Sequence, residues 1–109
     1  MTTRAPAPRR QSSAARFLEK LADGPLSFGA LLRSIREGEE MTLAAFAEQL
    51  GVSRQNVCDI EHGRRFVSPA RAAEWAAVLG YSEKQLVRLA LQDQVSQAGL
   101  HLRVVVEAA

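Results

Sequence analysis

Apolar residues recur with helical spacing from about residue 27 to residue 97. Five successive segments place apolar residues at positions i, i+3, i+4 and i+7, or at part of that series, as one buried helix face requires. A serine or threonine opens each segment, and a glycine follows most of them, as helix caps do. The predicted helices therefore begin at Ser27, Thr42, Ser53, Ser68 and Ser82.

Both ends of the chain depart from this pattern. Residues 1–12 hold three arginines and two prolines, which is typical of a disordered basic arm, and residues 13–26 follow as a short helix and a linker. After Gly99 the period changes to two, because Leu102, Val104 and Val106 alternate with their neighbours. We therefore predict a β-strand within residues 99–109. An isolated strand needs a partner, and the expected partner is the same strand of a second copy.

The last predicted helix has a second apolar stripe, formed by Val87, Leu91 and Val95. A terminal helix with two apolar stripes needs a second covering surface. Either a second copy of the chain covers it, which makes it part of a dimer interface, or the helix at 13–22 does. The fold class expected from all these segments is all-α, with one domain over residues 27–98.

Residues 42–63 predict two short helices joined by a tight turn at Gly51. In that arrangement the start of the second helix projects and fits the major groove of DNA. Arg54 and Gln55 lie in its first turn, where arginine can bind guanine and glutamine can bind adenine through paired hydrogen bonds. Asp59, one turn beyond Gln55, can accept a hydrogen bond from cytosine or repel a phosphate. We predict these three residues as base contacts.

Residues 31–80 resemble the Cro/repressor family of helix-turn-helix proteins, also called lambda-repressor-like. The matching positions are Leu32-Arg33-x-Ile35-Arg36-Glu37, Met41-Thr42-Leu43, Phe46-Ala47, Leu50-Gly51-Val52-Ser53, Val57, Ile60-Glu61-x-Gly63-Arg64 and Ala72-x-x-Trp75-Ala76-x-x-Leu79-Gly80. The resemblance implies a five-helix DNA-binding domain that reads bases with the helix at about residues 53–62. From this resemblance, together with the second stripe and the C-terminal segment, we expect a homodimeric repressor on a palindromic operator, with no cofactor.

The resemblance also implies roles for particular residues. Arg54, Gln55 and Asp59 match positions that read bases, and Arg36 and Glu61 match a structural ion pair. Leu43 replaces a glutamine that often contacts the DNA backbone, so one such contact is expected to be missing. The positions implied to contact phosphates are Ser53, Asn56, Arg64 and Arg65.

The charge is distributed unevenly. Residues 1–26 contain five basic and two acidic side chains, a balance of +3, whereas residues 27–109 contain nine basic and ten acidic ones, a balance of −1. The domain is therefore not uniformly basic, and a DNA-binding face must gather its cations locally. The basic arm could follow DNA or remain a passive tail.

Several other classes of function are disfavoured. The single cysteine, Cys58, cannot form an internal disulfide, and with two histidines it gives no metal-ligand spacing. We find no nucleophile–base set and no phosphate-binding glycine loop, so an enzyme is not expected. No apolar stretch approaches the roughly 18 residues of a membrane span, and we expect a cytoplasmic protein. The main alternative to a repressor is an antitoxin that binds a toxin protein and regulates its own promoter.

Overall fold

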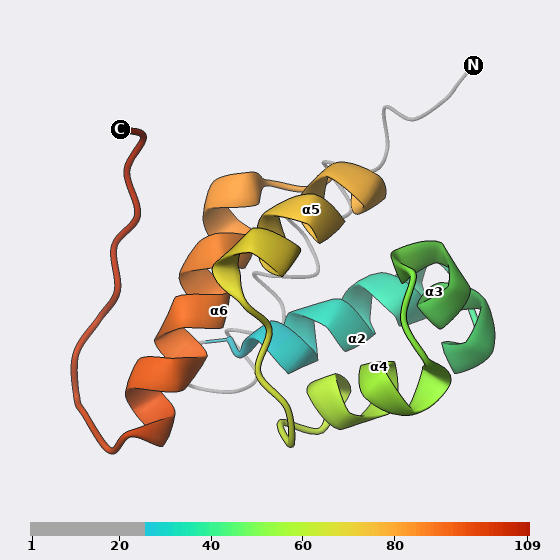
Figure 1. Ribbon diagram of the computed structural model, residues 1–109, viewed down its shortest axis with the longest axis horizontal. Helices are drawn as coiled ribbons and strands as arrows, with labels where there is room; N and C mark the ends of the chain where they lie inside the picture. Colours follow the sequence, from blue (N-terminus) through green and yellow to red (C-terminus); the bar gives the residue numbers. More distant parts are fainter. Residues whose placement is uncertain (1–25) are drawn as a thin grey trace.

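The five helices predicted between residues 27 and 98 are all present. In the computed structural model, residues 26–109 are described, and the expected basic arm (1–12) and N-terminal helix (13–22) lie outside this range. Figure 1 shows the helices packed around a common core, with α5 beside α6 and α3 beside α4. They are α2 (Phe28–Gly38), α3 (Leu43–Leu50), α4 (Arg54–Glu61), α5 (Pro69–Leu79) and α6 (Glu83–Gln97).

The helices start where the sequence places a capping side chain. In each case the side-chain oxygen of the preceding serine or threonine accepts a hydrogen bond of 3.1 Å from a backbone N–H in the first turn. Such a cap stabilises a helix by about 1 kcal/mol. The N-caps are Ser27, Thr42, Ser53, Ser68 and Ser82.

Trp75 of α5 lies at the centre of the core and is 1% exposed. Its indole Nε1 donates a hydrogen bond of 3.2 Å to the backbone oxygen of Leu50, the last residue of α3. The side chain therefore joins α5 to α3 through both apolar contact and a satisfied polar group. The other large, fully buried side chains come from α2, α3, α4 and α6, and they are Leu31, Leu32, Phe46, Val57, Leu86 and Leu89.

The predicted C-terminal β-strand is wrong. Residues 100–109 form neither helix nor strand and run alongside α6 (Figure 1). Gln92 of α6 is 8% exposed, and its side-chain amide donates to the oxygen of Leu102 (2.9 Å) and accepts from the N–H of Val104 (2.7 Å). One glutamine side chain thus bonds the backbone groups that a neighbouring strand would otherwise bond. The period of two remains visible, because Val104 and Val106 are half-buried while Val105 is exposed.

Candidate nucleic-acid interface

The turn between α3 and α4 is short and tightly bonded. Gly51 adopts the left-handed conformation (φ 77°), and the N–H of Val52 donates to the oxygen of Ala47 (3.0 Å). Ala47 and Val57 are buried where α3 and α4 meet. Ser53 then caps α4, so the first turn of α4 starts at a fixed place on the surface of α3. This is the projecting helix that the sequence predicts.

The far end of α4 rests directly on α2. A Cβ atom added at Gly29 would collide with the backbone oxygen of Ile60 and would lie 3.1 Å from that of Glu61. Only glycine allows the two backbones to approach so closely. This role of Gly29 was not predicted from the sequence, where an isolated glycine within an otherwise helical pattern is the one available sign.

Arg36 of α2 and Glu61 of α4 form the ion pair implied by the family resemblance. Arg36 donates from Nε (2.8 Å) and Nη2 (3.1 Å) to the two carboxylate oxygens of Glu61, and from Nη1 to the backbone oxygen of Met41 (3.0 Å). The Glu61 side chain is 1% exposed and that of Arg36 is 15% exposed. The hydrogen bond with Glu61 raises the pKa of Arg36 above its usual value. Together with Gly29, this pair fixes the end of α4.

The start of α4 presents its polar side chains to solvent. Ser53, Arg54 and Gln55 are exposed, and Arg54 forms no ion pair with any residue between 26 and 109. The Arg54 guanidinium is therefore exposed to solvent and not neutralised by a carboxylate within residues 26–109. Asn56 differs, because it is half-buried and its Oδ1 is buried with no hydrogen-bond partner in the described part of the chain.

Asp59 lies between two of the predicted DNA contacts. Its Oδ1 accepts hydrogen bonds from Gln55 Nε2 (2.9 Å) and from Arg64 Nε (3.0 Å). The hydrogen bond from Gln55, and then the hydrogen bond and charge of Arg64, hold the pKa of the Asp59 carboxyl below its usual value. Arg65 has a smaller effect in the same direction. The sequence predicts each of these residues near DNA but does not predict that they bind one another.

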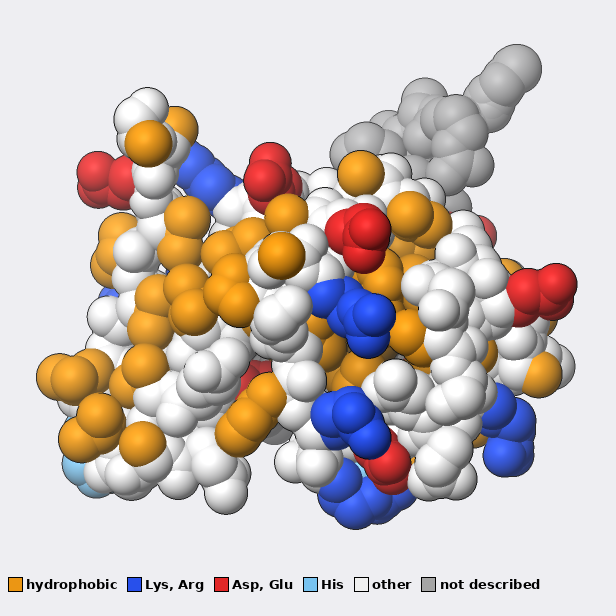
Figure 2. Space-filling view, in the orientation of Figure 1, with side chains coloured by type: hydrophobic (Ala, Val, Ile, Leu, Met, Phe, Trp, Pro, Cys, Tyr) orange, Lys and Arg blue, Asp and Glu red, His pale blue; other side chains and the backbone are white. Residues whose placement is uncertain are grey.

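Arginines gather around α4. Arg54 at its start and Arg64 and Arg65 in the loop after it are all exposed. In Figure 2, basic side chains cluster over α4 and that loop, with an acidic group among them. Without these three arginines, residues 27–109 contain six basic and ten acidic side chains. This cluster therefore provides the local positive field that phosphate binding requires.

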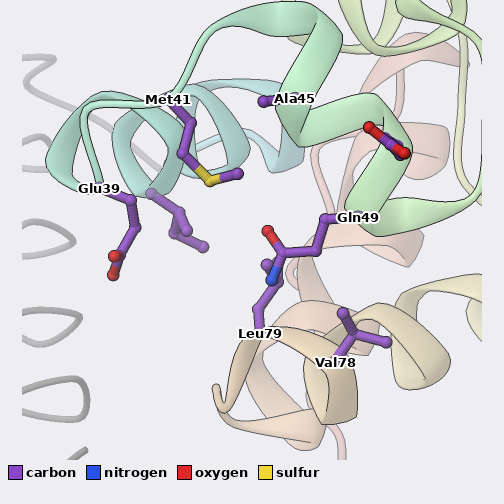
Figure 3. A pocket seen from close by; sticks show the side chains of 8 residues that line it. Glu39, Met41, Ala45, Gln49, Val78 and Leu79 are labelled. Atoms are coloured by element: carbon purple, nitrogen blue, oxygen red, sulfur yellow. The ribbon is translucent and has the colours of Figure 1, made fainter.

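A separate hollow of about 470 Å³ lies between α2, α3 and α5 (Figure 3). Met41 and Gln49 reach toward Leu79 across it, and Glu39 and Glu48 are among the residues that line it. Acidic side chains in its lining disfavour phosphate, so this hollow does not extend the basic surface. Within residues 26–109 we find no group of three or more metal-ligating side chains.

Comparison with known proteins identifies the family. A family model described as a helix-turn-helix domain matches residues 27–89, which is more than half of the chain. No curated protein and no solved structure matches this chain. None of the helices in the described region has the length and apolar character needed to cross a membrane. The chain therefore belongs to the helix-turn-helix family of DNA-binding domains, consistent with the Cro/repressor resemblance of residues 31–80.

Proposed function

We propose that this protein is a sequence-specific transcriptional regulator that acts as a homodimeric repressor. The observation that carries the proposal is the exposed first turn of α4, which has arginines around it. The helix itself is held at its start by the turn at Gly51 and at its end by Gly29 and the Arg36–Glu61 pair. Arg54 would bind guanine and Gln55 would bind adenine in the major groove. Ser53 and the arginines at 64 and 65 would hold phosphates, and the protein would repress by occupying a promoter.

Asn56 would contribute a weaker phosphate contact. Asn56 is only half-buried and its backbone N–H donates to Ser53 Oγ, but its Oδ1 is buried, so part of the side chain faces the protein. The Nδ2 group is the only part of this side chain that can donate to a phosphate. We therefore assign the main contacts with the DNA phosphates to Arg64 and Arg65. Asn56 and Ser53 would fix the orientation of α4 on the DNA.

A second copy would bind the face formed by α6 and the C-terminal segment. Leu91 and Val95 of α6 are half-buried, whereas Leu102 and Val105 are 62% and 70% exposed. Figure 2 shows apolar side chains concentrated on this side of the molecule. The groove between α6 and the segment has a volume of about 800 Å³, enough to receive side chains of another copy. The residues that the sequence predicts at this interface are Val87, Leu91, Val95, Leu102, Val104 and Val106.

A symmetric pair would place two α4 helices in successive major grooves, roughly 34 Å apart, on a palindromic site. Analytical ultracentrifugation of the wild type and of Val105→Glu tests the pairing. We expect the wild type to sediment as a dimer and the variant as a monomer. The control is Val78→Glu, which adds the same charge at a residue of α5 that is 47% exposed, and it should remain a dimer. A wild type that stays monomeric at high concentration would exclude the homodimer.

Sequence reading is tested by selecting bound fragments from random duplex DNA. We expect the wild type to enrich a palindrome and the double variant Arg54→Ala/Gln55→Ala to retain only weak, salt-sensitive binding. The control Lys84→Ala removes a cation from the start of α6, which lies on the other side of α2 from α4 (Figure 1). If the wild type enriches nothing at moderate salt, specific readout is wrong. The antitoxin alternative would then be pursued by seeking a toxin partner.

A further inference from the structure

The side chains of Gln55 and Arg64 both donate hydrogen bonds to Asp59 in the DNA-free protein. Gln55 Nε2 lies 2.9 Å from Asp59 Oδ1, and both Nε and Nη2 of Arg64 lie 3.0 Å from the same oxygen. The backbone N–H of Arg64 also donates to the backbone oxygen of Asp59 (2.8 Å). Asp59 therefore binds one proposed base contact and one proposed phosphate contact. The Asp59 side chain is 22% exposed, so the cluster lies at the surface where DNA would bind.

The bond to Asp59 fixes which way the Gln55 amide faces. A carboxylate only accepts hydrogen bonds, so the N–H₂ end of Gln55 must point toward it and the carbonyl end must point away. One N–H and the carbonyl oxygen remain free, and they form the donor–acceptor pair that matches N7 and N6 of adenine. Without Asp59 the amide could rotate by half a turn, which would exchange the positions of its donor and acceptor.

The same carboxylate reduces the net positive charge of the surface. Arg64 donates from Nε to Asp59, and its Nη2 lies 3.0 Å from the same carboxylate oxygen, so its charge is offset. A phosphate approaching this arginine also approaches an anion, so binding to DNA of arbitrary sequence is weakened. Asp59 thus lowers general affinity while it orders the side chain that reads a base.

We propose that Asp59 is a positioning residue that holds Gln55 in the orientation that selects adenine, rather than a residue that reads a base itself. This inference deepens the proposed function and rests on it. The competing role is direct reading of cytosine through Oδ2, which accepts no hydrogen bond from the described residues. The two roles predict changes at different base pairs.

The test compares Asp59→Asn, Asp59→Ala and Gln55→Ala by binding to the selected site and to its single-base-pair variants. Gln55→Ala identifies the base pair that Gln55 reads. Asp59→Asn keeps an oxygen for Gln55, so the adenine preference should survive. Asp59→Ala should reduce discrimination at that base pair by about tenfold, close to the effect of Gln55→Ala. Both Asp59 variants should bind random DNA more tightly than the wild type, because Arg64 loses its counter-charge.

The double variant Gln55→Ala/Asp59→Ala separates an indirect role from a direct one. If Asp59 acts through Gln55, the second substitution changes base preference no further. A change at a different base pair in both Asp59 variants would mean direct reading and would overturn the inference. Unchanged preference in Asp59→Ala would also overturn it while leaving the proposed function intact. If the wild type itself selects no sequence, the proposed function fails and this inference fails with it.

Discussion

Glu61 is a buried carboxylate that depends on one arginine. Its side chain is 1% exposed, and within residues 26–109 its carboxylate accepts two hydrogen bonds, both from Arg36 of α2. Removing the arginine leaves the charge buried and unpaired, so Arg36→Ala should lower the free energy of unfolding by about 3–5 kcal/mol. Urea denaturation followed by circular dichroism measures this loss. The matched control is Arg33→Ala on the same helix, whose bond to Glu37 is more than half exposed and should be worth less than about 1 kcal/mol. Equal losses in the two variants would contradict the prediction.

Asp93 predicts a pH dependence of stability. The Asp93 carboxylate accepts a hydrogen bond from the N–H of Phe28 (3.1 Å), and burial raises the pKa of this carboxyl while that bond opposes the rise. Because the folded state then binds the proton more tightly than the unfolded state, the contribution of Asp93 is greatest in acid. It is lost as the pH rises through the folded pKa.

The variant Asp93→Asn keeps an acceptor for Phe28 but cannot ionise. We expect it to be more stable than the wild type at neutral pH and to lose that advantage as the pH falls toward the ordinary pKa of an aspartate, about 4. Urea unfolding at a series of pH values gives the difference. Glu107→Gln, a change at an exposed carboxylate, serves as the control. A stability difference that does not vary with pH would count against burial as the cause.

At the scale of elements, the helix starts could be predicted because capping is local. Ser53 and the other caps bond to backbone groups three residues away, and the sequence displays both partners together. The C-terminal segment could not be predicted in this way. Its backbone is bonded by Gln92, ten to twelve residues earlier on another element, and apolar alternation does not reveal whether a strand or a side chain provides the partner.

The contact between α2 and α4 predicts an unusual effect of a small substitution. Replacing glycine with alanine inside a helix normally stabilises it by roughly 1 kcal/mol. At Gly29 the new methyl group would strike the backbone at Ile60, so the end of α4 would have to move. We expect Gly29→Ala to lower the melting temperature and to weaken binding to the selected DNA. A rise in melting temperature would show that α4 has room to shift.

At the scale of the whole molecule, the position of the site could be predicted, but its internal bonding could not. Arg54 and Gln55 are exposed in the first turn of α4, as the turn at Gly51 and the cap at Ser53 imply. Side-chain directions within the site depend on neighbours chosen by the fold. For that reason the sequence does not show that Asp59 binds both Gln55 and Arg64.

The uneven charge of the molecule predicts a salt dependence. Arg65 is exposed in the loop after α4, and it would neutralise one phosphate per copy. Arg65→Ala should reduce the slope of log K against log salt concentration by about 0.9 per copy without altering base preference. Fluorescence anisotropy at several salt concentrations measures the slope. Lys84→Ala, on the other side of α2 from α4, should leave the slope unchanged.

The shortness of α4 limits how much information one copy can extract from DNA. A helix of eight residues is about 12 Å long, which corresponds to about four base pairs at 3.4 Å each. A given sequence of four base pairs occurs by chance about once in 256 positions, so a genome would contain thousands of equivalent binding sites. Two copies that together read eight base pairs would reduce that number of sites by a further factor of about 256. The length of this one helix is therefore a reason, independent of any apolar surface, for the protein to bind its DNA site as a dimer.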